Sequence, residues 1–577
     1  MSDAEPPKIE PDAPNQVGAG FDFADPNSPL APYYLRTTHV VAIAFLALLF
    51  VVNTMFPLWH TDVWGHVRYG QWMVENRAIP EREPFCPWWD GRQRFTQFYT
   101  ISHLIMYAVY AVGAALAAGD DLAKFTGGVE ALRGLHALLV ALRYALLYLA
   151  FGRLARNWSV AFVGIVAVVL LDLSNMAVFR PQSFGQVFFA LALIPLSAPI
   201  LSRRAIIGLS ILTAIWANTH GSYLVVHGLL FALLAGRIAE CLFPAEGRAV
   251  APWRDPAARR YAIALAAVTL AACGNPYGAG LYARTFEMTR HPSLVTAVGE
   301  WQPLSFTMGP GWHWPFLASI AILAGLALAS RRPIPYGTLF AVLLFGVGAC
   351  IQNRMVIWWA MVLPWALVPL LADVAERIPE RFAPTSVPSL RKTMLAVVLA
   401  LAILNWSGLA ETLRSGLPKL QDAVSGGTPW PVARQIADPD KPFVADWQTE
   451  FQAILNRNYG GRFRGAILAT PMQGDYLMWS LAPGVPVTYA HIHLFHPDFW
   501  DELGVVGQGN AGWWDIVDKY GVNLMVMEAE YCAKLLAEIR KRPEVWKVLL
   551  DETGSTEKVQ KLNRQLIVVR IHPIGTR

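Results

Sequence analysis

Charged residues are scarce in this sequence. Only 15% of its 577 residues are Asp, Glu, Lys or Arg, whereas soluble globular proteins carry about 25%. Hydrophobic residues make up 54% of the chain, and many lie in long uncharged runs of the kind that a membrane-crossing helix requires. The composition therefore excludes a wholly soluble, fibrous or disordered protein.

Cysteine pairs and the common motifs of soluble enzymes are also absent. The five cysteines lie far apart with no C-x-x-C pair, which argues against a disulfide framework and a zinc site. There is no P-loop, dinucleotide-binding glycine pattern, Gly-x-Ser-x-Gly elbow or HExxH. The net charge of +5 is modest and the arginines lie mainly between apolar runs, so no nucleic-acid partner is expected.

Three regions of different composition follow one another. Residues 1–37 are rich in proline and acidic residues and predict a disordered tail. Residues 38–409 predict about 11 to 13 transmembrane helices, with a polar, aromatic loop over 59–100. Residues 410–577 predict an α/β domain, with strands at 465–470, 485–489, 522–527 and 565–571 and a helix at 531–542.

The arginine-rich segments predict the orientation. Arg203 and Arg204, residues 237–260, Arg331 and Arg332, and residues 377–392 all fall between apolar runs, which places them in the cytoplasm and the C-terminal domain outside it. Eleven predicted spans, of which the first two start near Ile101 and Leu135, then separate the 59–100 loop from that domain, although an even number is needed if both are outside. A broken or re-entrant element between Ile101 and Phe179, near Arg143 or Asp172, would remove the conflict.

The segment after the first span carries the main candidate for chemistry. In a helix starting at Asp62, the side chains of Asp62, His66 and Tyr69 share one face. A carboxylate beside an imidazole could take a proton from a nucleophile. The same residues also fit an interfacial anchor in which tryptophan rings lie at headgroup depth and Asp62 caps the helix.

Several ordered motifs resemble bacterial members of the GT-C superfamily, which are polytopic glycosyltransferases related to the protein O-mannosyltransferases. The first stretch runs from Asp62 to Trp72 and continues with Ile79-Pro80 and Glu83-Pro84-Phe85. In the family pattern Asp-x-Trp-Trp-His and Asp-Pro-Phe-Ser, this chain has Gly65 for the second Trp, Glu83 for the Asp and Cys86 for the Ser. Later motifs that fit are 180–182, 216–221, 275–278, 300–302 and 474–477.

The resemblance implies an integral membrane glycosyltransferase that acts on the extracytoplasmic side, in a bacterial inner membrane. A polyprenyl-phosphate sugar would be the lipid-linked donor, and transfer to an unknown acceptor (protein, glycan or lipid) would invert the anomeric centre. Asp62 would activate the acceptor or hold a divalent cation such as Mg²⁺ or Mn²⁺, with Glu83 as a second acid and His66 beside it. No other cofactor is expected.

The resemblance and the chain order together suggest substrate contacts. Arg180 and Arg354 lie at predicted outer ends of spans and could bind the donor phosphate, or simply reach lipid headgroups. Asn218 and His220 could line a groove or hold two helices together. Glu300 and Trp301 could contact a sugar, and Glu300 could equally be a solvated loop acid.

Other histidines offer weaker candidates. His103 starts the second predicted span and could reach the same site, while His491, His493 and His496 cluster in the C-terminal domain. Strand alternation would place only His491 and His493 on one side, without an acid at ligand spacing, so no metal site is predicted. The alternatives to an enzyme are a lipid or solute transporter, which broken spans would also suit, and a non-catalytic GT-C-fold subunit.

Overall fold

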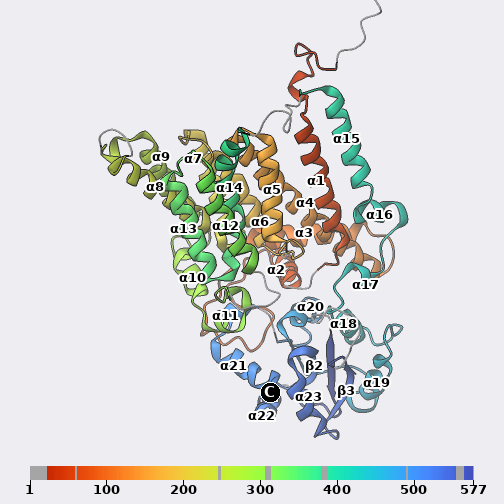
Figure 1. The fold of residues 1–577 in the computed structure, drawn as a ribbon. Helices are drawn as coiled ribbons and strands as arrows, with labels where there is room; N and C mark the ends of the chain where they lie inside the picture. The colour runs from red at the N-terminus through yellow and green to blue at the C-terminus, as the bar shows by residue number, and fades with distance from the viewer. Residues whose placement is uncertain are drawn as a thin grey trace, which may run out of the picture.

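The computed structural model describes residues 23–58, 62–173, 175–244, 249–305, 313–377, 387–488, 491–553 and 564–575. A bundle of apolar helices forms the larger part, and a domain built on a β-sheet lies at one end of it (Figure 1). The bundle helices are α1 (Thr37–Met55), α4 (Asp121–Ala155), α5 (Trp158–Asp172), α6 (Gln182–Leu196), α7 (Arg203–Ala217), α8 (Leu224–Leu242), α9 (Pro256–Ala272), α12 (His313–Ala329), α13 (Tyr336–Ile351), α14 (Val356–Ala375) and α15 (Leu390–Leu404).

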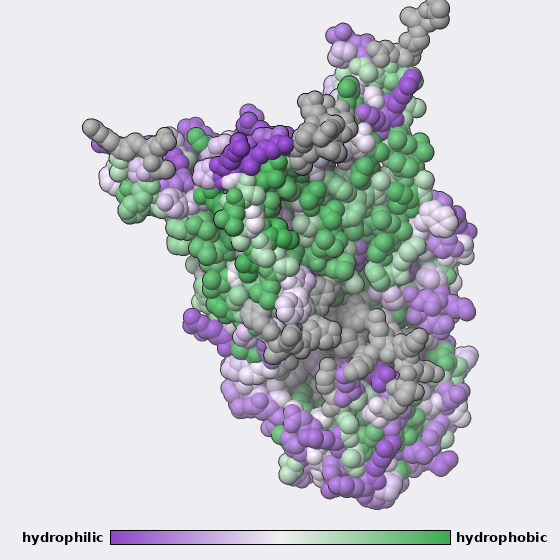
Figure 2. All heavy atoms as spheres, in the orientation of Figure 1, coloured by the Kyte–Doolittle hydropathy of each residue, from purple (hydrophilic) through white to green (hydrophobic). Residues whose placement is uncertain are grey.

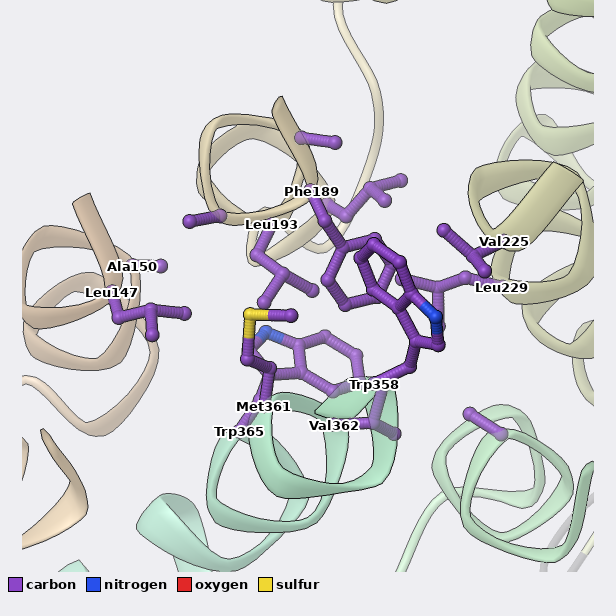
Figure 3. Packing of buried hydrophobic residues seen from close by; sticks show 14 of the residues in the cluster. Leu147, Ala150, Phe189, Leu193, Val225, Leu229, Trp358, Met361, Val362 and Trp365 are labelled. Carbon is purple, nitrogen blue, oxygen red and sulfur yellow. The ribbon is translucent and has the colours of Figure 1, made fainter. Parts of the chain in front are cut away.

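Helix α14 is the most enclosed element of the bundle. Its apolar side chains point in all directions and nearly all are buried, the pattern of a helix surrounded by other helices. Trp358, Met361, Val362 and Trp365 pack against residues of α4, α6 and α8 (Figure 3). The bundle core is thus organised around α14.

Apolar side chains also cover the outside of the bundle. Figure 2 shows a hydrophobic band over the helices, with hydrophilic surface above it and on the β-sheet domain below. Within the described residues, four helices are long and apolar enough to cross a membrane, or five if α15 and the bent continuation α16 (Gly408–Ser415) form one span. Other apolar helices have 10 to 17 residues, so fewer full-length spans are present than the 11 to 13 predicted.

Helix α3 (Thr100–Leu116) corrects the predicted span near Ile101. It starts beside α2 (Val63–Asn76), and α4 then starts near the β-sheet domain, where Asp121 pairs with Lys441 at 3.2 Å. Both ends of α3 therefore lie at the same end of the bundle. The span predicted near Leu135 is the later part of the continuous, 35-residue α4.

Arg143 lies inside the continuous α4, and Asp172 is the last residue of α5. Their side chains pair across α4 and α5 at 2.7 Å and are buried. Within the range Ile101 to Phe179, where the sequence predicted a broken or re-entrant element, it is α3 that starts and ends at the same end of the bundle. Without α3 and the short helices of 10 or fewer residues, the helices between the loop after α1 and the C-terminal domain are α4 to α9 and α12 to α15. This number is even, which agrees with the loop and the domain lying at the same end of the bundle.

The arginine-rich segments gather at the opposite end of the bundle. Arg237 pairs with Asp255 at 2.7 Å, and Arg332 with Glu376 at 3.4 Å. The N-terminal segment reaches the same end, because Leu35 pairs with Ser389 at the start of α15. Residues 23–36 are therefore packed on α15, whereas the sequence predicted disorder over 1–37; residues 1–22 lie outside the described residues.

The C-terminal domain contains a four-stranded sheet in the order β1-β2-β4-β3. The strands are β1 (Ala466–Ala469), β2 (Val522–Glu528), β3 (Trp546–Asp551) and β4 (Gln565–Arg570), with β1 parallel to β2 and the other pairs antiparallel. The segment predicted as a strand at 485–489 makes a single bridge, between Val487 and Ile467, and β3 was not predicted. The helices are α17 (Leu420–Ala423), α18 (Trp430–Ala437), α19 (Trp447–Ile454), α20 (Pro471–Leu481), α21 (Pro497–Gly507), α22 (Trp513–Lys519) and α23 (Ala533–Arg540).

Candidate functional site

Asp62 lies directly before α2, at the end of the bundle that meets the C-terminal domain. Its backbone is left-handed, with φ of 52°, a region that residues other than glycine seldom adopt and that is often found at functional sites. Its carbonyl accepts the first hydrogen bond of α2, from the His66 N–H at 3.1 Å. Its side chain makes no capping bond, so the carboxyl is not used to start the helix.

Charged groups from three distant parts of the sequence surround the Asp62 carboxyl. Burial raises its pKa, while Arg180 and Arg354 act to lower it and Glu300 to raise it. Three of the predicted site residues are thus brought near Asp62. A carboxyl with a raised pKa is better matched to accepting a proton near neutral pH than an ordinary aspartate.

Two of these groups are already paired with one another. The Arg180 guanidinium donates to both Glu300 oxygens, at 2.9 and 3.1 Å. Although burial opposes it, Arg180 and Arg354 lower the pKa of Glu300, which stays ionised. The charge of Arg180 is therefore balanced by Glu300, and its role as a phosphate contact stays a prediction.

Arg354 has a different environment. It comes from η5 (Asn353–Met355), just before α14, and its guanidinium lies over the Trp301 ring at 4.1 Å. This stacking holds the planar group in place. It leaves the guanidinium N–H groups as donors for an anion.

His66 is not positioned as the predicted partner of Asp62. Its Nδ1 lies 2.7 Å from Nε2 of His103, and its ring packs against His491 at 5.2 Å. Burial and neighbouring positive groups keep the pKa of His66 well below its usual range, so the ring is neutral. The expected Asp62–His66 pair is replaced by a histidine pair that joins α2 to α3.

Glu83 is buried rather than exposed to a substrate. It accepts hydrogen bonds from the Tyr69 hydroxyl and from the N–H groups of Phe85 (2.8 Å) and Cys86 (3.3 Å). Burial raises its pKa to about 7, against the effect of these bonds. Glu83 therefore holds the 83–86 turn against α2.

Asp475 is a site residue that the sequence-based assignment of roles missed. It lies in α20, is fully buried, and neither of its carboxyl oxygens has a hydrogen-bond partner among the described residues. Burial, with added repulsion from Asp62 and Glu83, raises its pKa well above the usual range. Its place in the Gly474 to Leu477 motif was the available signal.

The glycine at position 65 explains how the Asp475 side chain can approach α2 so closely. A Cβ at position 65 would lie 2.9 Å from Asp475 Oδ1 and 3.0 Å from His491 Cε1. The departure from tryptophan at this position therefore makes room for two side chains of the C-terminal domain. The domain and α2 together enclose the site.

His220 is fixed in one tautomer by its neighbours. Its Nδ1 accepts from the Ser222 N–H at 3.0 Å, and the Ser222 hydroxyl lies 2.6 Å from the same nitrogen and accepts from Trp216 Nε1 at 3.1 Å. Burial and the nearby arginines keep the pKa of His220 low. The single ring proton is thus on Nε2. Asn218, in contrast, bonds to the Ala214 and Gly274 carbonyls, which supports its alternative role of holding helices together.

His220 and Arg354 line a cavity of about 300 Å³, here called the α8–α13 cavity. Its polar end includes Tyr99, Gln182, His220, Trp301 and Arg354. The rest is lined mainly by apolar side chains of α8, α13 and α14 and by residues of α10 (Gly280–Thr289). Asp62 does not line this cavity. Arg354 does line it and also acts to lower the pKa of the Asp62 carboxyl, so this arginine connects the cavity with Asp62.

Helices α8 and α13 both line the cavity. They touch closely at Gly236, where a Cβ would lie 2.0 Å from the Gly337 nitrogen. Nearer the β-sheet domain, Gly228 and Leu344 face the cavity, and Leu344 is also 44% exposed on the outside of the bundle. The cavity is therefore continuous with the apolar outer surface.

The described side chains around the site offer few ligands for the divalent cation that the resemblance implies. Among the described residues, no group of three His, Cys, Asp or Glu side chains could hold a metal ion. Glu300 is engaged by Arg180, and Trp59, His60 and Thr61 lie outside the described residues.

No protein-family model and no curated protein matches this chain. It is similar to two solved structures of an oligosaccharyltransferase from Archaeoglobus fulgidus. The apo form has a TM-score of 0.48 and 12% identity over 85% of this chain and 70% of that one. The complex with Zn and sulfate has a TM-score of 0.44 and 13% identity over 85% and 68%. Likeness at this level assigns neither activity nor ligand, which rest on the site itself.

Proposed function

We propose that this protein is an integral membrane glycosyltransferase that uses a polyprenyl-phosphate sugar on the side of the membrane where the C-terminal domain lies. The α8–α13 cavity carries the proposal. It joins an apolar space, continuous with the outer surface of the bundle, to a polar end with Arg354 and His220. This combination suits a ligand with an isoprenoid tail and a phosphate.

The chemistry follows from the groups at the polar end. The acceptor hydroxyl attacks the anomeric carbon, the bond from that carbon to the phosphate oxygen breaks, and the phosphate leaves as an anion. Arg354 and the Nε2–H of His220 stabilise this charge. Asp62, whose pKa is raised by burial, takes the proton of the hydroxyl.

Replacement of Asp62 by Asn tests this role. We expect transfer from a polyprenyl-phosphate sugar by the purified protein to fall by a factor of about 10² to 10⁴, the usual contribution of a general base. Donor binding should change little, because the donor contacts are elsewhere. Unchanged turnover would remove Asp62 from the mechanism.

Replacement of Arg354 by Gln tests the donor contact separately. The KM for the donor should rise, whereas Arg290→Gln, an exposed arginine at the end of α10, should leave it unchanged. Movement of the lipid across sealed vesicles without product formation would instead favour the transporter alternative. A stable larger complex without any transfer would favour the non-catalytic subunit.

A further inference from the structure

A second pocket lies where the start of α4 meets the C-terminal domain. Its volume is about 270 Å³, and its walls come from the α3–α4 turn, α4, α18 and α20. It shares no lining residue with the α8–α13 cavity, and the proposed reaction uses none of its side chains. We call it the α4–α20 pocket.

Aromatic rings that cannot move freely form one wall of this pocket. The Trp479 ring packs on Phe125 at 5.4 Å, Tyr476 at 5.6 Å and Trp64 at 4.8 Å. Phe125, Tyr476 and Trp479 all line the pocket, together with Trp430. A rigid aromatic wall offers apolar contact area at little entropic cost to a flat, partly apolar ligand.

The polar groups around the pocket are balanced in charge. Asp120 and Asp121 contribute two carboxylates, and Arg434 and Lys441 contribute two cations. Asp121 and Lys441 pair at 3.2 Å, whereas the Arg434 guanidinium has no hydrogen-bond or ion-pair partner among the described residues. Such a set does not favour an anion or a cation, but its planar groups can bind neighbouring hydroxyls.

We propose that the α4–α20 pocket is a saccharide subsite that holds one or two neutral sugar rings. The fixed aromatic wall fits the C–H face of a pyranose, and the charged side chains fit its hydroxyls. The volume lies near the lower end of the range for small-ligand pockets. A ligand much larger than a disaccharide would extend out of the pocket.

The pocket is joined to Asp62 through shared elements. Trp64 follows Asp62 in the sequence by two residues and packs on Trp479. Helix α20 carries Asp475 next to Asp62 and Gly65, and Tyr476 and Trp479 in the pocket. A saccharide here would be the distal part of a glycan acceptor, a role that rests on the proposed glycosyltransferase function, although saccharide binding itself does not.

Binding can be measured without any transfer. The full-length protein in detergent would be titrated with methyl mannoside, maltose and N,N′-diacetylchitobiose, using tryptophan fluorescence and saturation-transfer NMR. We expect saturable binding of at least one, with a millimolar or lower Kd. Arg434→Ala should weaken it about ten-fold, and Arg462→Ala, an exposed arginine of the same domain, should not.

The outcomes separate the two proposals. No saturable binding of any of the three sugars, or equal binding by wild type and Arg434→Ala, would overturn the saccharide subsite. Asp62→Asn should still bind saccharide with wild-type affinity. Loss of transfer in that variant with intact saccharide binding would support both proposals. Unchanged transfer would contradict only the role of Asp62 as general base and would leave the saccharide subsite unaffected.

Discussion

Gly65 shows how one missing side chain shapes the site. Any Cβ there would meet the Asp475 carboxyl and the His491 ring at about 3 Å, and the rigid interface leaves little room for either to move. Overpacking of this kind costs about 1 to 3 kcal/mol.

Gly65→Ala should therefore lower the melting temperature of the purified protein and reduce transfer. Gly504→Ala is the matched control, because a Cβ at that position in α21 meets no atom within 4 Å. Equal melting temperatures for both variants and wild type would show that the interface tolerates the methyl group.

The raised pKa of Glu83 predicts how the stability of the protein depends on pH. Its folded pKa of about 7 lies above its value of 4.5 in an unfolded chain. The folded state therefore binds this proton more tightly, so its contribution is most favourable below about pH 4.5 and is progressively lost as the pH rises to 7.

Glu83→Gln keeps a neutral side chain at every pH. We expect the melting temperature of this variant to fall less between pH 5 and pH 7.5 than that of wild type. Glu75→Gln, which changes an exposed side chain of α2, is the control. Parallel pH profiles for Glu83→Gln and wild type would contradict the prediction.

At the scale of helices, the close contact between α8 and α13 at Gly236 sets the position of two helices that line the cavity. Gly236 lies against the Gly337 backbone, which cannot turn aside as a side chain could. Gly236→Ala should therefore push the two helices apart. We expect a higher KM for the lipid donor with smaller change in kcat, whereas Gly208→Ala in α7, where a Cβ meets nothing, should behave as wild type.

The buried pair between α4 and α5 makes a second prediction at this scale. Arg143 and Asp172 lie 2.7 Å apart with almost no exposure, so removing one partner leaves an uncompensated charge. Arg143→Met alone should destabilise the protein by about 3 to 5 kcal/mol. Adding Asp172→Leu should restore most of the melting temperature, and a double variant as unstable as the single one would contradict this.

The order and type of most elements could be predicted from hydrophobic runs and from proline and glycine. The position of α3 could not, because its apolar composition is that of a span, and only its contacts with α2 and α4 keep it at one end. For the site, Arg180, Glu300 and Arg354 could be named from their places in the chain. Their pairing, and the insertion of Asp475 beside Gly65, depend on contacts between distant segments.

For the whole molecule, the placement of the 59–100 loop and the C-terminal domain at one end of the bundle makes a topological prediction. Single cysteines at Gly91, Ala118 and Gly416 should all react with a membrane-impermeant maleimide in intact cells, since all three positions lie at the end that holds the C-terminal domain. A cysteine at Arg204, at the other end, should react only after permeabilisation. Protection of Ala118 alone would show that α3 crosses after all. The native cysteines would first be replaced by serine.

The approach of Asp475 and His491 to Gly65 has a consequence for biosynthesis. The wall that encloses Asp62 comes from segments more than 400 residues later in the chain. A growing polypeptide can insert its helices while that side of the centre is still open to water. The protein would then become active only after the last quarter of the chain has been synthesised and has packed against α2. Truncated or stalled products should therefore be inactive, rather than active with low specificity.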